Sequence, residues 1–170
     1  ELYTVKYLGN VVDGDIIQYA NVPINELKKA AIKSLKKNEA VWFGCDVGKW
    51  LNYSKGVMDL DIFDYENLFD ISFNMNKATR LEYGESVMTH AMLFTGVDIL
   101  NDKPQKWRVE NSWGDKGGDK GYYLMTDKWF DQYNYEVVVD KKYLPKEILA
   151  IFDKEPQELQ PWDPMGSLAK

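Results

Sequence analysis

The stretch MTHAMLFTGVD, residues 88–98, contains the only histidine of the 170-residue chain. Small and apolar residues follow His90, a pattern typical of a strand that is buried in a sheet. Taken alone, a histidine in such a strand is more often a core residue than a functional one. A chemical role for His90 therefore depends on the residues that the fold brings beside it.

A second stretch, WRVENSWGDKGGDKGYYLM at residues 107–125, has apolar strand character at both ends. Asn111 and Trp113 end its first strand, and a glycine-rich turn leads into the next one. The turn glycines supply the backbone freedom that a tight turn needs, and we assign them no chemistry. They are Gly114, Gly117, Gly118 and Gly121.

Outward from these two stretches, the chain is predicted to form an antiparallel sheet with helices attached, an α+β fold. Alternating apolar residues indicate the strands, and apolar residues three and four apart indicate two helices. Between about residues 48 and 86 no period is visible. The predicted strands are 2–8, 11–19 (paired with the first), 39–47, 87–98, 106–113, 121–126 and 135–140, and the predicted helices are 24–38 and 127–133.

The first predicted helix places Ile24, Leu27, Ala31 and Leu35 on one face, with Asn25 as its N-terminal cap. The opposite face carries lysines. They could form a basic patch for a partner, but the acidic total favours a solvated outer face of a packed helix. The lysines are Lys28, Lys29, Lys33, Lys36 and Lys37.

Composition excludes several classes of protein. The chain is 45% apolar, enough for one domain core, and no apolar run approaches the roughly 18 residues of a membrane span. A single cysteine excludes an internal disulfide framework and a cysteine-rich zinc site, and it fits a reducing cytosol. The net charge of −6 opposes general binding to nucleic acid or to an anionic membrane.

The two ends of the chain carry predictions of their own. A strand pattern begins directly after Glu1, which suggests a fragment whose partner sequence lies upstream. Near the other end, three prolines exclude a helix or strand that runs through the final segment. We therefore expect one domain at 1–152 and an extended arm at 153–170 that lies on another surface. The prolines are Pro156, Pro161 and Pro164.

The two strand stretches together resemble the histidine and asparagine segments of papain-like cysteine peptidases, including Asn-Ser-Trp-Gly and the Gly-Tyr that follows it. AVWFGCDVGKW and GVMDLD are similar to the strand and loop that precede this histidine. The ending QPWDPMGSLAK resembles one branch of the family, the bleomycin hydrolases. The resemblance covers nearly the whole chain and is weakest in the middle loop. It implies the barrel-like, β-rich domain of the papain-like fold.

The resemblance implies that His90 is the catalytic base and that Asn111 orients it. A thiol attacks an amide as the thiolate, and an imidazole can take its proton and give it to the leaving amine near neutral pH. The side-chain oxygen of asparagine can hold the other ring nitrogen without adding a charge. Trp113 is expected at the substrate site, where it would cover the hydrogen bond between His90 and Asn111.

Cys45 precedes His90 and Asn111, which is the chain order of the family's catalytic residues, but its local sequence and spacing do not fit the nucleophile. Family nucleophiles lie near the start of a helix, roughly 130 to 150 residues before the histidine. Cys45 ends an apolar strand only 45 residues before His90, so we interpret it as a small buried hydrophobe. The nucleophile and the oxyanion donor are then expected in an N-terminal part outside this chain, and this chain alone should be inactive.

The resemblance to bleomycin hydrolases implies that the arm lies in the active-site cleft, with Trp162 between two of its prolines as an anchor. The terminal carboxylate would pair with the α-ammonium of a substrate, which selects peptides with free amino termini. Lys170 would bring a second ammonium to that place, so we expect Lys170 to be trimmed and Ala169 to carry the carboxylate. Ala169 and Lys170 are therefore predicted substrate-binding residues.

The resemblance thus predicts a cytosolic cysteine aminopeptidase that acts through a thioester acyl-enzyme, without a metal or organic cofactor, as a homohexamer. Two alternatives stay open. The first is a papain-like endopeptidase whose tail is unrelated to specificity. The second is a non-catalytic module that binds nucleic acid through the helix lysines. No membrane partner is expected.

Overall fold

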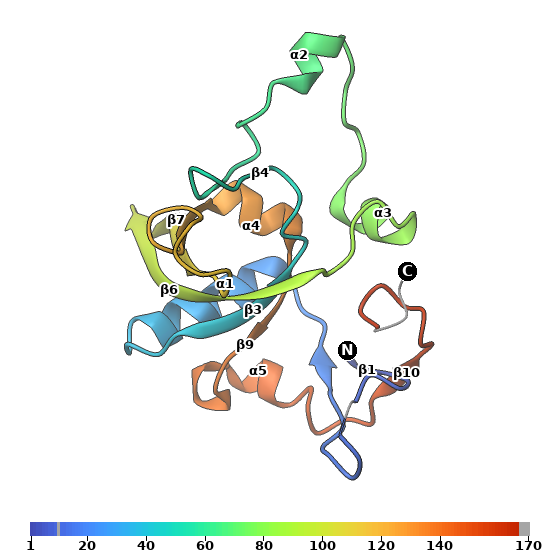
Figure 1. Ribbon diagram of the computed structural model, residues 1–170. Coiled ribbons are helices and arrows are strands. Elements are labelled where there is room, and N and C mark those ends of the chain that lie inside the picture. The colour runs from blue at the N-terminus through green and yellow to red at the C-terminus, as the bar shows by residue number, and fades with distance from the viewer. Residues whose placement is uncertain (10, 167–170) are drawn as a thin grey trace.

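Seven strands form the main sheet, in the order β4-β5-β8-β7-β6-β3-β9 (Figure 1). The computed structural model describes residues 1–9 and 11–166. The sheet curls into a half-barrel, and the predicted α+β class is confirmed. Neighbouring strands are antiparallel as predicted, except that β5 and β8 are parallel. The strands are β3 (Val41–Cys45), β4 (Leu51–Asn52), β5 (Val57–Met58), β6 (His90–Leu100), β7 (Lys103–Glu110), β8 (Tyr122–Thr126) and β9 (Asn134–Val138).

The two longest strands, β6 and β7, form a hairpin that positions the candidate site. Asn101 and Asp102 join them with φ of 50° and 61°, the sign that a type I′ turn requires at both residues. Along β7, Trp107 and Val109 are buried while Arg108 between them is exposed, which is the period of a half-buried strand. The hairpin brings the beginning of β6 and the end of β7 to the same edge of the sheet.

Aromatic side chains fill the core between the sheet and two helices. The ring of Phe43 stacks on that of Phe94, with centroids 3.8 Å apart. Phe94 and Trp107 both stack near Phe130, at 5.4 Å and 4.9 Å. This layer joins three strands to one helix, so it fixes how the sheet curls around its core. The two helices are α1 (Ile24–Leu35) and α4 (Asp127–Tyr133).

The helix α1 buries the predicted face, because Ala31 is fully buried and Ile24, Leu27 and Leu35 pack against the core. Asn25 is not its cap. Pro23 occupies the cap position with extended backbone, and no side chain caps the helix. Proline is already fixed at a φ suited to this boundary, so the helix begins directly after it. Among the described residues, no helix is both long and apolar enough to span a membrane.

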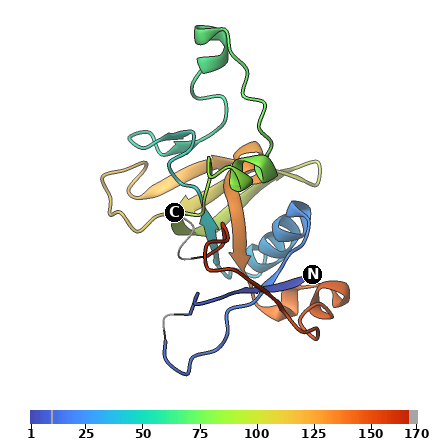
Figure 2. The ribbon, with the colours of Figure 1, turned by 90° about the vertical axis from the view of Figure 1, so that its right-hand side faces the viewer.

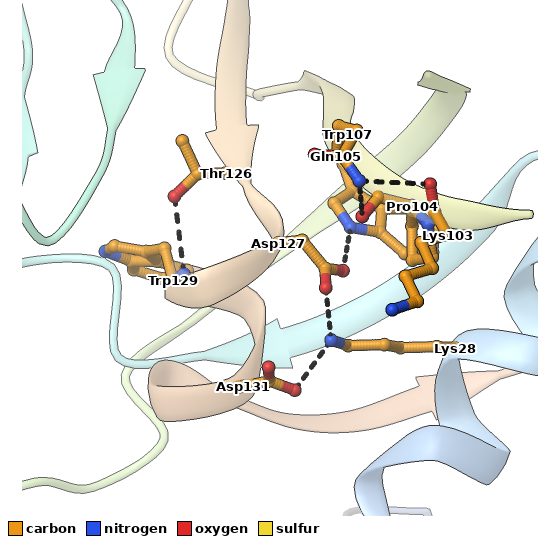
Figure 3. Close-up of polar contacts among 9 residues, drawn as sticks. All are labelled: Lys28, Lys103, Pro104, Gln105, Trp107, Thr126, Asp127, Trp129 and Asp131. Atoms are coloured by element: carbon orange, nitrogen blue, oxygen red, sulfur yellow. Dashed lines mark hydrogen bonds and ion pairs between the residues drawn. The ribbon is translucent and has the colours of Figure 1, made fainter. Parts of the chain in front are cut away.

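Lys28 departs from the solvated lysine face that the sequence predicts, whereas the other four lysines of that stretch are exposed as predicted. Lys28 is only 6% exposed, and its Nζ lies 2.7 Å from Oδ2 of Asp127 and 2.7 Å from Oδ1 of Asp131 (Figure 3). Trp107 donates its indole N–H to the other oxygen of Asp127 over 3.1 Å. The amphipathic pattern missed this because the two aspartates lie on α4, about a hundred residues later. Lys33 also donates inward, to the Tyr143 carbonyl.

Replacing Lys28 by methionine should lower the free energy of unfolding by about 2 kcal/mol, because two partly buried carboxylates would lose the one cation that pairs with them in the described part of the chain. Lys29→Met is the matched control. Lys29 is exposed and, among the residues that the structure describes, pairs only with Glu26 in the same helix, so its replacement should cost less than about 0.5 kcal/mol. Urea unfolding of both variants measures the difference, and equal losses would contradict the role of Lys28.

The middle of the chain is largely irregular, as predicted, but four short elements interrupt it. Figure 1 shows one of its helices at the end of a long excursion that stands away from the sheet. Apolar side chains on this excursion face solvent, among them Leu68, Phe69 and Phe73. The elements are β4, β5, α2 (Tyr65–Phe69) and α3 (Lys77–Glu82).

A second, three-stranded sheet joins the beginning of the chain to the arm (Figure 2). The predicted pairing of the first two strands is confirmed, with the second strand shorter than expected. The arm contains a short strand that runs parallel to the first one, although no strand runs through the prolines of this segment, as predicted. The residues between Pro156 and Pro161 all keep their backbone N–H groups, which suffices for three residues of pairing. The strands are β1 (Leu2–Val5), β2 (Tyr19–Ala20) and β10 (Gln157–Leu159).

Beyond β10, the arm is held unevenly. Pro161 is buried, whereas Trp162 is 68% exposed and is no anchor against the described part of this chain. The connection from β9 to the arm consists of η1 (Lys141–Tyr143) and α5 (Lys146–Leu149). The division into a domain at 1–152 and an arm at 153–170 stays a prediction.

Candidate active site

His90 and Asn111 meet at the edge where β6 begins and β7 ends. His90 is the first residue of β6, and Asn111 directly follows β7. The antiparallel register of the two strands brings these ends together, although the residues are 21 positions apart. Nε2 of His90 lies 2.8 Å from Oδ1 of Asn111, within hydrogen-bond distance. The structure therefore brings the two predicted residues into direct contact.

The hydrogen bonds around Asn111 assign the protonation of the histidine ring. The backbone N–H of Ser112 donates to Oδ1 of Asn111 over 2.8 Å, so this atom is the amide oxygen and not the nitrogen. An amide oxygen only accepts, so the proton of the neutral imidazole must be on Nε2. Nδ1 then keeps its lone pair. The geometry leaves one ring nitrogen free to act as a base.

Trp113 covers one face of the imidazole. Its ring is nearly parallel to that of His90, with centroids 4.6 Å apart and an angle of 28° between the planes. Tyr53 lies on the tryptophan at 5.9 Å. Trp113 itself is 41% exposed, so it shields the ring while it stays open to solvent on its own outer side. This placement suits the covering role that the sequence predicts for Trp113.

The far side of Asn111 packs on groups that the sequence does not reveal. Its backbone N–H donates to the carbonyl of Gly121 over 3.1 Å. Its Nδ2 and the hydroxyl of Tyr123 are both buried and, among the described residues, make no hydrogen bond of good geometry. Burial raises the pKa of Tyr123, and an interaction with the Asn111 amide partly opposes that rise. The two groups are therefore near each other. Gly117 leaves the space that the Tyr123 hydroxyl occupies.

Cys45 lies directly opposite His90 in the ladder between β3 and β6. It is nevertheless fully buried, and burial, with a smaller contribution from the charge of Asp46, raises the pKa of its thiol far above the ordinary value. A thiol in this environment stays protonated and unreactive near neutral pH. Cys45 is a buried core side chain, and it is not a candidate nucleophile.

Two predicted substrate-binding residues, Ala169 and Lys170, lie outside the described residues. The site also contains a group of residues that sequence reasoning missed. Asp46, Ser86, Thr89 and Tyr135 form a polar network behind the backbone that leads into His90. They come from three separate segments, the end of β3, the stretch before β6 and β9, and no motif connects them.

The chain is similar to several known proteins. It is 56% identical to bleomycin hydrolase of Gallus gallus over 174 residues, which cover 100% of this chain and 38% of that protein. It is 50% identical to aminopeptidase C of Listeria monocytogenes over 169 residues, with 99% and 38% covered. The crystal structure of PepW from Lactobacillus rhamnosis matches with a TM-score of 0.94 and 52% identity, covering 98% of this chain and 38% of that one.

These matches confirm the resemblance that the sequence predicts, and the chain spans 38% of the length of each of these relatives. The Peptidase C1-like family matches residues 1–166, which is nearly the whole chain. The two strand segments that meet at His90 and Asn111 lie within that match. The chain therefore belongs to the Peptidase C1-like family, among homologues of bleomycin hydrolase and aminopeptidase C.

Proposed function

We propose that the protein containing this chain is a cysteine aminopeptidase of the bleomycin hydrolase type, which removes amino-terminal residues from peptides. The observation that carries the proposal is the hydrogen bond between Nε2 of His90 and Oδ1 of Asn111, which leaves Nδ1 as the ring nitrogen that can exchange a proton with the thiol. A base held in this way, with Trp113 over its face, is what acyl transfer from an amide to a thiol requires.

In the proposed reaction, Nδ1 of His90 takes the proton of the nucleophilic thiol, and the thiolate attacks the carbonyl carbon of the scissile amide. The resulting imidazolium gives that proton to the leaving amine as the carbon–nitrogen bond breaks, which leaves a thioester. Water then attacks the thioester, and Nδ1 takes a proton from the water and returns it to the departing thiol. Throughout, Oδ1 of Asn111 accepts from Nε2–H, so the ring keeps its orientation without an added negative charge.

The nucleophile is proposed to belong to sequence outside this chain. Cys45 is the only cysteine here, and its burial removes it from the reaction. The chain alone would then hold the base and its orienting partner without a thiol to activate. We expect the isolated chain to be inactive and an N-terminal part to supply both the thiol and the oxyanion donor.

The aminopeptidase specificity is assigned to the arm. Its terminal carboxylate, on Ala169 after loss of Lys170, would pair with the α-ammonium of a peptide and exclude longer chains from the cleft. The name aminopeptidase C carried by one group of relatives supports an aminopeptidase activity. A cytoplasmic location and a homohexamer are part of the same proposal. They rest on the resemblance to bleomycin hydrolases, and the single reduced cysteine is consistent with the location.

A pair of fluorogenic substrates tests the proposal with the full-length protein. We expect an amino acid amide with a free amino group to be cleaved, and its amino-acetylated form to be cleaved at least about 100-fold more slowly, because acetylation removes the charge that the arm would recognise. Equal cleavage of both would keep a cysteine peptidase and discard the role of the arm. Cleavage of neither would remove the proposed activity.

A further inference from the structure

A buried carboxylate lies next to the strand residue that faces His90. Asp46 directly follows Cys45, the residue paired with His90 in the sheet. Asp46 is only 5% exposed. Its Oδ2 accepts a hydrogen bond from the Ser86 hydroxyl over 2.8 Å, and its Oδ1 accepts a longer, weaker one from the Thr89 hydroxyl at 3.4 Å. The carboxylate thus contacts the residue immediately before His90.

Thr89 is fastened to the end of β3 by its backbone as well as by its side chain. Its N–H donates to the carbonyl of Cys45 over 2.9 Å, and its hydroxyl oxygen accepts from the N–H of Val47 at 3.3 Å. Ser86, on the other side of the carboxylate, is hydrogen-bonded to the hydroxyl of Tyr135 on β9. The segment that delivers His90 to the site is therefore tied to two strands through this network.

The negative charge of Asp46 has no cationic partner in an ion pair within the described residues. The nearby cations are engaged elsewhere: Lys49 pairs with Glu85 at 2.8 Å, and Lys77 and Arg80 of α3 donate to the carbonyls of Asn134 and Gln132. The neighbouring acids stay neutral near pH 7, because burial raises the pKa of Cys45 and of Tyr135, and the charge of Asp46 adds to both shifts. On its other side, His90 meets the uncharged Asn111 and Trp113.

A buried carboxylate without a counter-ion is costly, so its presence beside a site suggests a function. We propose that Asp46 is a positioning residue for His90, which fixes the approach of the histidine through Thr89 and stabilises the imidazolium that forms when His90 takes the thiol proton. This inference rests on the proposed peptidase function. The positive charge that arises on His90 during the reaction would then compensate the negative charge of Asp46.

The expected size follows from the register of the sheet. Residues directly opposite each other in an antiparallel ladder have Cα atoms roughly 5 Å apart, and Asp46 is one position along from the partner of His90, so we take the separation of carboxylate and imidazole to be on the order of 10 Å. At that separation, in a partly buried site, one charge changes the balance between neutral and charged imidazole by roughly tenfold. The sign is fixed: the carboxylate favours the charged ring, and its removal favours the neutral ring.

The test is the pH dependence of kcat/KM for the free-amine amino acid amide, measured on the full-length protein with Asp46→Asn. We expect the alkaline limb, where the imidazolium loses its proton, to move about one pH unit lower, with a roughly tenfold lower rate on that limb. The rate at the acidic end of the plateau should change much less. If circular dichroism shows that the Asp46→Asn variant is unfolded, Asp46→Ser tests the same shift of the alkaline limb with a smaller side chain.

Two matched variants separate charge from structure. Glu85→Gln removes an exposed, lysine-paired carboxylate from the same segment, and it should leave the limb in place. Thr89→Val removes the connecting hydroxyl but keeps the charge, so it should lower the rate at all pH values without moving the limb. If Asp46→Asn lowers kcat/KM equally at all pH values, or not at all, the inference about Asp46 is overturned. An inactive His90→Ala variant would in that case still support the proposed peptidase. An active His90→Ala would overturn both.

Discussion

Replacing His90 by alanine in the full-length protein should lower kcat/KM for a free-amine amino acid amide by about 10³- to 10⁴-fold. General acid and base catalysis by one positioned side chain contributes roughly this much, and the residue is proposed to act in both directions of proton transfer. His90 is half-buried at the edge of the sheet, so its loss should disturb the fold little compared with its effect on the reaction. Initial rates with the fluorogenic amide measure the effect.

Two further variants separate the chemistry of His90 from its packing. His90→Gln can still donate a hydrogen bond to Oδ1 of Asn111 but offers no base, so it should be as inactive as His90→Ala while folding like the wild type. Cys45→Ala is the control for disturbance on the opposite strand. Because Cys45 is buried and protonated, its replacement should leave kcat/KM within about twofold. A His90→Gln variant that keeps substantial activity would show that the base lies elsewhere.

The chain sequence predicts the central contact of the site but not its support. His90, Asn111 and Trp113 belong to two stretches with a family pattern, and the hairpin between them follows from strand periodicity. Their meeting at one edge is the consequence of an antiparallel register. In contrast, Asp46 and Ser86 are 40 residues apart and touch only because β3 and the segment before β6 are brought together in space. A single polar residue at a strand end carries no signal of that contact.

The fold shows the same division between local pattern and distant contact. The apolar face of α1 and the long strands β6 and β7 could be predicted, because each carries several turns or alternations of one period. The strands β4 and β5 have two residues each, too short for any period, and β5 is held by parallel pairing with β8, far along the chain. Helical periodicity predicts a surface position for Lys28, because it carries no information on the partners on α4. The strand in the arm also depends on a distant partner, β1.

Replacing Gly118 by alanine should lower the free energy of unfolding by about 3 kcal/mol or more, and should reduce activity with it. Gly118 has a φ of +61°, where an alanine side chain alone costs roughly 1 kcal/mol. An added Cβ would also overlap the backbone carbonyl oxygen of Tyr122 and lie 3.2 Å from Cα of Gly56. That carbonyl accepts the N–H of Asp119, so it cannot move aside without breaking a hydrogen bond of the turn.

Gly114→Ala is the matched control, because Gly114 has a similar φ of +77° but no atom within 4 Å of the position that a Cβ would take. It should lose only the conformational part, about 1 kcal/mol. Thermal or urea unfolding of both variants measures the difference, and equal losses would show that the overlap with the Tyr122 carbonyl and the approach to Gly56 carry no cost. The comparison also bears on the site. The turn that holds Gly118 ends at Gly121, whose carbonyl binds the backbone of Asn111, so a displaced turn should move the partner of His90. Gly118→Ala should therefore lower kcat/KM in the fraction of protein that stays folded, and Gly114→Ala should do so much less.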